Sequence, residues 1–210
     1  MPLYEITARR EKFDFDKYIC KDTIDAGEDG YVIPFGTGPK LFYEHPVAEQ
    51  SFINMINDAK KEILITTPYL IVDHALNSAL AAAVLRGVDV KIAIPDIPDK
   101  KIIYLITKSN AEYLLDKGVK IYRATGSFLH AKSIVADGEV AIIGTINFDY
   151  RSFLHHFENG VWLCKTPSVT ALREDCLAIC AEKNNFSNGV MLGFTSKLAA
   201  AFLKIFTPLF

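Results

Sequence analysis

A histidine and a lysine two residues apart, His130 and Lys132, are the side chains in this sequence best suited to chemistry. We predict a strand over 128–136, and side chains two apart on a strand share one face. An imidazole beside an ammonium is a poor arrangement for a plain core, because each group disfavours the charged form of the other. The pair suits a phosphate ester, since lysine neutralises phosphoryl oxygens and a neutral imidazole can attack phosphorus. Taken alone, a half-exposed strand with a polar face is the simpler interpretation.

Polar residues further along the sequence could reach the same phosphate. Thr145 and Asn147 follow the second strand of a predicted hairpin, and the turn there can deliver both side chains to one site. Glu158 begins the next predicted strand, where its carboxylate could hydrogen-bond to an imidazole. Asp137 stands at the Asp-Gly step that predicts the turn of the hairpin. An aspartate in that position is often structural.

The elements that must position these residues alternate along the chain. Strand, helix, strand, helix, strand at this spacing is typical of parallel crossover units, and the hairpin then adds antiparallel strands. We therefore expect an α/β fold, with a mixed β-sheet flanked by helices on both faces. The predicted strands are 31–35, 63–67, 88–94, 119–123, 128–136, 140–144 and 158–164, and the predicted helices are 46–59, 73–86, 101–116 (with a break near Ser109) and 167–183.

Composition excludes several classes of protein. Half of the 210 residues are hydrophobic and 23% are charged, which is ordinary for a globular domain and not for a disordered chain. The net charge of −2 provides no excess of positive charge to coat a nucleic acid. The four cysteines form no CxxC pair, so neither a zinc ribbon nor a disulfide framework is expected, and reduced thiols indicate the cytosol. The first residues contain no apolar stretch of the kind found in signal peptides.

The motifs, read together, resemble one family. The pattern HxKxxxxD starting at His130, followed by GTIN, FDYRSF and FE, resembles the phospholipase D superfamily, whose HKD motif is the first of these. The stretches DGYVIPFGTGP, ITTPYLIVDHAL, LRGVDVKI, PDIPDKK and GVKIY are similar to the C-terminal half of bacterial cardiolipin synthases. The resemblance covers about residues 29–183.

The resemblance implies a mechanism and roles for named residues. In the family, two HKD motifs meet across one active site; one histidine forms a phosphohistidine and the other protonates the leaving alcohol. His130 would be one of these histidines, and Lys132 with Asn147 would hold the phosphate. Thr145 stands where serine is more usual in the family, and its hydroxyl would bind the phosphate in the same way. Glu158 would orient His130. Asp137 belongs to the motif, although its place in the turn leaves a structural role open. No cofactor and no metal are implied.

The sequence departs from the family pattern in three ways. It contains one HKD motif, because the other four histidines have no lysine two residues on. The family's N-terminal transmembrane helices have no counterpart, and His156 stands where asparagine is usual before Phe-Glu. We therefore expect one half of an enzyme: a truncated, split or homodimerising form.

The function that these observations favour is phosphatidyl transfer in cardiolipin synthesis, from two phosphatidylglycerols to cardiolipin and glycerol. The partner would be a second HKD-bearing half or a second copy of the chain. Two alternatives are a homodimeric phosphodiesterase or nuclease and a catalytically silent remnant. The near-neutral charge argues against nucleic acid as a partner.

The chain divides into three expected parts. Residues 1–30 are expected to form a linker or arm, residues 31–186 the phospholipase D-like domain, and residues 187–210 an apolar tail. The tail contains one helical stripe that either closes the protein's own core or lies in a membrane interface, with two lysines on its flank. We predict peripheral binding to the anionic cytoplasmic face of the cell membrane, weakened by salt. The stripe is Leu198, Phe202, Ile205 and Leu209, and the lysines are Lys197 and Lys204.

Overall fold

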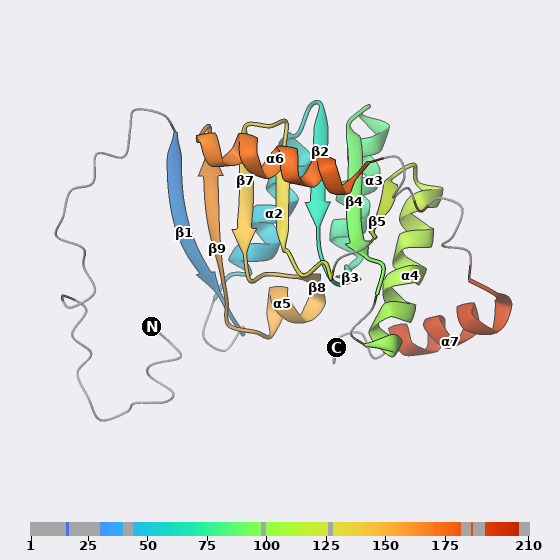
Figure 1. The fold of residues 1–210 in the computed structure, drawn as a ribbon. Coiled ribbons are helices and arrows are strands. Elements are labelled where there is room, and N and C mark those ends of the chain that lie inside the picture. Colours follow the sequence, from blue (N-terminus) through green and yellow to red (C-terminus); the bar gives the residue numbers. More distant parts are fainter. Residues whose placement is uncertain are drawn as a thin grey trace, which may run out of the picture.

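The protein is built on a mixed β-sheet with helices on both faces (Figure 1). We analysed a computed structural model, which describes residues 16, 30–39, 44–97, 100–125, 128–181, 186 and 192–205. In spatial order the strands of the main sheet are β1 (Tyr31–Thr37), β9 (Glu158–Cys164), β7 (Val140–Gly144), β6 (Ser133–Ala136), β2 (Glu62–Thr66), β4 (Asp89–Pro95) and β5 (Lys120–Ala124).

The direction of the strands changes in the middle of the sheet. β2, β4 and β5 run parallel, as crossover connections require. β6 pairs antiparallel with β2, and β7, β9 and β1 continue the antiparallel pairing. Two short strands, β3 (Leu70–Ile71) and β8 (Phe148–Asp149), form a separate parallel pair.

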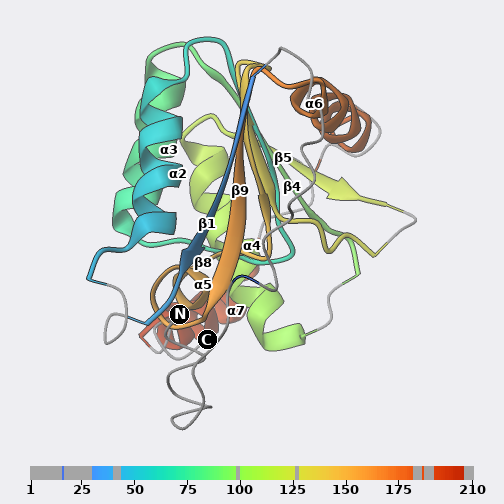
Figure 2. The same ribbon diagram turned by 90° about the vertical axis from the view of Figure 1, so that its left-hand side faces the viewer.

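Helices cover the two faces unequally. Figure 2 shows α2 (Val47–Asp58) and α3 (His74–Leu85) on one face and α6 (Pro167–Ile179) on the other. The larger core also includes α4 (Lys101–Asp116) and α5 (Tyr150–Leu154), whereas α6 closes a smaller core of its own. A last helix, α7 (Phe194–Lys204), packs on α4 through an ion pair between Lys197 and Glu112 at 2.5 Å.

The continuous apolar run in β2 reflects burial on both faces. Ile63 and Ile65 belong to the larger core, and Leu64 between them belongs to the core under α6. Successive side chains of a strand point to opposite faces, so a strand covered on both sides must be apolar at every position. β2 therefore lies inside the sheet. The loops that carry the site lie at the edge where β2 ends.

One edge of the sheet, where β2 ends, gathers the segments that carry the predicted site residues, apart from Asp137 in the hairpin turn. Thr66, at the carboxyl end of β2, pairs with Ser133, the first residue of β6. The end of β7 and the start of β9 meet at the same edge, where Gly144 pairs with Gly160. The residues before β6, after β7 and at the start of β9 are therefore neighbours in space.

The expected α/β class and the order of elements are confirmed, with differences at element ends. The predicted strand 128–136 is wrong in its first half, because the ladder begins at Ser133 and the preceding residues are irregular. The predicted break near Ser109 is also wrong: α4 is one helix from Lys101 to Asp116. The last predicted helix ends at Ile179, and the predicted extension beyond residue 181 lies largely outside the described residues.

Two expected helix ends are confirmed. Asp73 caps α3, with its carboxylate accepting a hydrogen bond from the backbone N–H of Leu76 at 2.9 Å. Gly87 has a positive φ of 87° directly after the C-cap of that helix, a conformation that favours glycine. The expected domain boundaries at residues 30 and 186 stay predictions. Leu209 of the predicted apolar stripe lies outside the described residues.

Candidate active site

His130 and Lys132 lie together in the irregular segment that leads into β6. The side-chain nitrogen of Lys132 is 2.8 Å from Nδ1 of His130 and donates to the carbonyl oxygen of His130 at 2.7 Å. The imidazole stacks on the ring of Phe128, with centroids 5.5 Å apart. His130 is exposed, so a ligand can reach the ring edge that Lys132 does not occupy.

Thr145, Glu158 and Ser152 form a second polar group at this edge. The Thr145 hydroxyl donates to Oε2 of Glu158, and the Ser152 hydroxyl donates to Oε1 at 3.2 Å. Asn147 donates from its amide to the Ser152 hydroxyl at 3.0 Å, and its side-chain oxygen is buried with no hydrogen-bond partner among the described residues. These contacts bring three of the predicted residues, Thr145, Asn147 and Glu158, into one network.

Two glycines at points of close approach explain how this network is positioned. At Gly144 an added Cβ would lie 2.3 Å from the carbonyl oxygen of Asn159, and at Gly160 it would lie 2.7 Å from the ring of Phe35. Glycine at position 144 lets the end of β7 approach the backbone of β9, and glycine at position 160 leaves room for the ring of Phe35 in β1. Thr145, the next residue, consequently sits beside β9, where its hydroxyl accepts from the backbone N–H of Asn159 at 3.0 Å.

An arginine and a histidine extend the network away from Thr145. Arg151 donates from Nε to Nε2 of His156 at 2.6 Å, and Nδ1 of His156 lies 3.5 Å from Oε1 of Glu158. Because an arginine N–H can only donate, Nε2 accepts and the proton of a neutral ring is on Nδ1, facing Glu158. His156 therefore links the cation of Arg151 to the carboxylate of Glu158.

Asp149 holds the short helix that carries Arg151 and Ser152. Its carboxylate accepts a hydrogen bond from the backbone N–H of Ser152 at 2.6 Å, which caps α5. Burial raises the pKa of Asp149 above its usual value, against the opposing effect of the hydrogen bonds from Ser152. The loop after β2 is joined to the same region, because Thr67 accepts from the backbone N–H of Phe148 at 3.1 Å.

Asp137 lies at the opposite edge of the sheet from His130 and Lys132. Four residues of extended chain separate it from Lys132, and the five steps between the two span roughly 17 Å. Its carboxylate accepts backbone hydrogen bonds from Lys60, Lys61 and Glu62 at 2.8, 2.7 and 3.0 Å. Partial burial acts to raise the pKa of Asp137, but these three hydrogen bonds outweigh it and hold the pKa below its usual value. The contacts are those of a structural residue that ties the hairpin to the start of β2.

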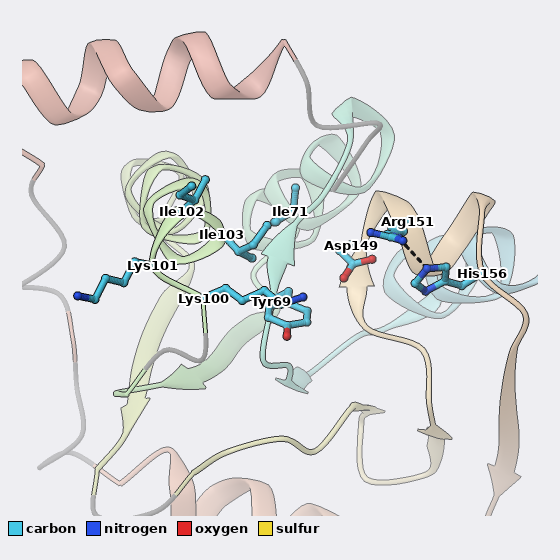
Figure 3. A pocket seen from close by; sticks show the side chains of 9 residues that line it. All are labelled: Tyr69, Ile71, Lys100, Lys101, Ile102, Ile103, Asp149, Arg151 and His156. Atoms are coloured by element: carbon cyan, nitrogen blue, oxygen red, sulfur yellow. Dashed lines mark hydrogen bonds between the residues drawn. The ribbon is translucent and has the colours of Figure 1, made fainter.

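A cavity of about 510 Å³ opens beside the network, between the loop after β2, the start of α4 and α5 (Figure 3). Isoleucines lie on one side of it, and Arg151, His156 and Asp149 lie on the other. The lining residues are Tyr69, Ile71, Lys100, Lys101, Ile102, Ile103, Asp149, Arg151 and His156. Neither His130 nor Lys132 is among them.

A family model for the cardiolipin synthase, phospholipase D-like domain matches residues 52–178, which include every side chain of the candidate site. The chain belongs to this family.

The curated relatives are longer than this chain. A cardiolipin synthase from Halalkalibacterium halodurans is 42% identical over 158 residues, which are 75% of this chain and 31% of that protein. A cardiolipin synthase from Staphylococcus aureus is 36% identical over 178 residues, 83% of this chain and 35% of that protein. An uncharacterized protein from Streptococcus mutans is 37% identical over 94% of this chain and 43% of its own length. The chain thus spans less than half the length of these relatives.

Solved structures share the fold. The phospholipase D family member Nuc from Salmonella typhimurium has a TM-score of 0.61 at 22% identity, with 74% of this chain and 96% of that chain covered. A phosphatidylserine synthase from Haemophilus influenzae has a TM-score of 0.61 at 17% identity, with 85% of this chain and 45% of that chain covered. At these identities the likeness establishes the phospholipase D fold.

The structure divides the six predicted site residues into three sets. His130 with Lys132 form one, Thr145 with Asn147 and Glu158 form another, and Asp137 stands apart. Among the described residues, Glu158 makes its hydrogen bonds to Thr145 and Ser152 and makes none to His130. Within the same ranges no cluster of three or more His, Cys, Asp or Glu residues is arranged to hold a metal ion, and no helix is long and apolar enough to cross a membrane.

Sequence reasoning missed four polar residues of the site. Asp149, Arg151 and Ser152 lie within the FDYRSF stretch, which was recognised as a motif without roles for its members. His156 was noted because it stands where asparagine is usual in the family, whereas it bridges Arg151 and Glu158. The sequence signal that could have found them is the short spacing between the GTIN turn and Glu158. A short helix between these two segments must lie close to both.

Proposed function

We propose that this chain supplies one His–Lys half of a phosphatidyl transferase that converts two phosphatidylglycerols into cardiolipin and glycerol. The observation that carries the proposal is the contact between Lys132 and Nδ1 of His130, at the sheet edge that also bears Thr145 and Glu158, in a member of this family. The cardiolipin synthase relatives at 36% and 42% identity support the choice of lipid.

The chemistry would proceed in two steps through a phosphohistidine. An imidazole attacks the phosphorus of the first phosphatidylglycerol, the bond from phosphorus to the headgroup oxygen breaks, and a second histidine protonates the departing glycerol. A headgroup hydroxyl of the second phosphatidylglycerol then attacks the phosphohistidine, and the phosphorus–nitrogen bond breaks. The hydroxyl proton returns to the second histidine, so cardiolipin and glycerol are the products.

Lys132 would neutralise phosphoryl oxygens during both steps. An ammonium held near the imidazole is already at the place where negative charge gathers in the transition state, and such preorganised donors are effective because they need no rearrangement. Asn147 and Thr145 would add hydrogen bonds to the same phosphate. Their present partners, Ser152 and Glu158, hold both side chains in the turn after β7.

The proposal requires a second histidine from outside this chain. One ring cannot attack phosphorus and at the same time protonate the leaving oxygen. The sequence contains a single His–Lys pair of this kind, so the second would come from another copy or from a separate HKD-bearing half.

A homodimeric phosphodiesterase acting on nucleic acid is the second candidate. It is favoured by one observation: Nuc, with which this chain shares its fold, is matched over 96% of its own length, whereas the cardiolipin synthases are matched over about a third. The net charge of −2 argues against it, because a nucleic-acid backbone calls for an excess of Lys and Arg.

A peripheral position on the cytoplasmic face of the cell membrane would suit a lipid enzyme, and α7 supports it. Phe194, Leu198 and Ile205 are 83%, 66% and 71% exposed and follow one another at intervals of one and two helical turns. Large apolar side chains at this spacing form a face suited to a membrane interface. The lysines have other surroundings in this structure, since Lys197 pairs with Glu112 of α4 and Lys204 is half-buried. The attraction would therefore be mainly hydrophobic.

The test separates the purified chain by size and offers each species labelled phosphatidylglycerol or single-stranded DNA. We expect cardiolipin from species that contain two copies, or from the chain mixed with an HKD-bearing N-terminal half, and none from the monomer. Transfer by a strictly monomeric species would contradict the half-site proposal. Cleavage of DNA without lipid transfer would favour the nuclease, and inactivity under every condition would leave the silent remnant.

A further inference from the structure

The cavity beside the site has an apolar side and a charged side. Ile71, Ile102 and Ile103 supply apolar side chains on one side, and Arg151 with His156 stand across from them (Figure 3). A volume of about 510 Å³ is ordinary for a small-molecule site. An amphipathic anion, with an acidic group next to a hydrocarbon chain, matches both sides.

The acidic group would meet a preformed partner. Arg151 is held by its hydrogen bond to Nε2 of His156, and His156 in turn lies beside Glu158. That single hydrogen bond uses one of five guanidinium N–H donors, so the guanidinium can still bind phosphate oxygens in pairs. Lys100 lies on the same cavity and adds a second cation.

A phosphate in this cavity would be distinct from the one attacked at His130. The cavity is lined by neither His130 nor Lys132, yet it is connected to the site through His156, Glu158 and Thr145. The transfer proposed above needs two such phosphates, because the accepting phosphatidylglycerol keeps its own phosphodiester while its headgroup hydroxyl attacks.

We propose that the cavity binds the acceptor phosphatidylglycerol. Its phosphate would lie at Arg151 and Lys100, and its glycerol backbone with the first acyl carbons would lie on the three isoleucines. Ile102 is 57% exposed at the start of α4, the helix on which α7 packs, so acyl chains could leave the cavity toward the exposed apolar face of α7. The assignment rests on the proposed phosphatidyl transfer.

Binding to the purified chain tests the cavity without any catalysis. The probe is monomeric dihexanoyl-phosphatidylglycerol, followed by titration calorimetry and by NMR of isoleucine methyl groups. We expect it to bind more tightly than either inorganic phosphate or dihexanoylglycerol, and to shift the methyl signals of Ile71, Ile102 and Ile103. Equal affinity for inorganic phosphate would indicate a simple anion site and would overturn the lipid assignment.

Matched variants separate charge and apolar contact from general damage. Arg151→Gln should raise the Kd about tenfold or more, as the loss of a charge-assisted hydrogen bond predicts, and Arg151→Lys should recover part of the affinity. The control is Lys117→Gln, because Lys117 is exposed at the other end of α4 and does not line the cavity. Ile102→Ser should weaken binding, while Leu85→Ser, on an exposed face of α3, should not. Unchanged affinity in Arg151→Gln would overturn the proposal.

The role as acceptor site is tested in the assembled, active species. Exchange of labelled free glycerol into phosphatidylglycerol needs the donor step alone, whereas cardiolipin formation needs both lipids. Arg151→Gln should lower the ratio of cardiolipin formation to glycerol exchange about tenfold. Equal loss of both activities would overturn the assignment to the acceptor. Absence of both activities in the wild-type protein would contradict the proposed function instead, and the binding result would still decide what the cavity takes.

Discussion

The ammonium of Lys132 lies 2.8 Å from Nδ1 of His130, and this contact determines which ring nitrogen can react. A lysine ammonium has only N–H donors, so Nδ1 accepts and a neutral ring carries its proton on Nε2. In this state Nε2 can donate a hydrogen bond to a phosphate oxygen, but it has no lone pair with which to attack phosphorus. To attack phosphorus from Nε2, the ring must first be released by Lys132, which a phosphate would achieve by drawing the ammonium onto its own oxygens.

Lys132→Ala should therefore change both turnover and tautomer. We expect the rate of cardiolipin formation to fall by about 10²–10³, the usual cost of losing a preorganised charge-stabilising donor. Without the donor at Nδ1, the ¹⁵N chemical shifts of the His130 ring should show a larger share of the Nδ1–H form. Lys132→Arg is the matched control, since it keeps a cation and donors. Unaltered ring shifts in Lys132→Ala would mean that Lys132 does not hold the imidazole.

Asp137 should matter for folding and not for chemistry. Asp137→Asn removes the charge that accepts three backbone N–H groups, and we expect a loss of about 1–3 kcal/mol in the free energy of unfolding, measured with urea. Asparagine tolerates the positive φ of 55° at this position, so backbone strain does not confuse the result.

The pH dependence of this loss has a definite sign. Because the pKa of Asp137 is lowered in the folded protein, its stabilisation is present above the unfolded pKa of about 3.9 and disappears as the pH falls through the folded value. Wild type and Asp137→Asn should thus converge in stability under acid conditions. A variant that folds as well as the wild type and yet has no transfer activity would assign Asp137 to the chemistry.

Glu49 should make the protein less stable as the pH rises through neutrality. Burial, the nearby charge of Asp73 and a hydrogen bond with it raise the pKa of Glu49 from 4.5 to about 7. The stability that protonated Glu49 provides is complete below about pH 4.5 and is lost as the pH rises through 7. Glu49 is only half-buried, so solvent screening limits the effect to about 1 kcal/mol.

Glu49→Gln isolates this contribution. The variant should be more stable than the wild type at alkaline pH and should match it near pH 4.5, as measured by thermal unfolding across the pH range. Asp58→Asn, a change on the same helix, is the control for a general effect of removing a carboxylate. Parallel pH curves for the wild type and Glu49→Gln would show that Glu49 does not share its site with Asp73 as described.

The exposed face of α7 should bind membranes with little dependence on salt. Replacing Leu198 and Ile205 together by serine should lower partitioning onto phosphatidylglycerol vesicles about tenfold or more, since each buried aliphatic side chain contributes about 1.5–3 kcal/mol. Raising the salt from about 0.1 M to about 1 M shortens the Debye length from ~10 to ~3 Å, yet binding should change less than about twofold because Lys197 is already paired with Glu112.

Co-sedimentation of vesicles with the intact chain, the double variant and Leu85→Ser measures this. A chain that ends at Asn188 provides a further comparison, provided that it still folds without the contact between α7 and α4. Equal sedimentation of the intact chain and the double variant would show that α7 is not the anchor. A steep loss of binding with salt would restore the electrostatic role first expected for the lysines.

Much of the fold could be predicted because its signals are local. The run Ile63–Leu64–Ile65 is apolar at each position, as a strand covered on both faces must be, and Asp73 and Gly87 mark the ends of a helix by their capping chemistry. The start of β6 could not be found in the same way. Nothing local distinguishes Leu129 to Lys132 from a strand, and the ladder begins at Ser133 because that is where β2 ends.

The site was predictable as far as the motif extends in sequence. His130 and Lys132 are in contact, but the contact was expected from a strand over these residues, and the structure has an irregular segment there instead. The bridge from Arg151 through His156 to Glu158 depends on how a five-residue helix turns between two strands, which no periodicity reports. Asp137 lies at the far edge because the whole length of β6 separates it from Lys132. Its place in the HKD motif had suggested a catalytic role.

The central claim is that His130 performs the chemistry of phosphatidyl transfer. The most direct test is the rate of cardiolipin formation by His130→Ala, compared with the wild type in the same size-resolved, assembled species. His130 is exposed, so the variant should keep the thermal stability of the wild type. We predict no cardiolipin above background from His130→Ala, because the mechanism requires two histidines and His130 is one of them. Transfer at a substantial fraction of the wild-type rate would contradict the account.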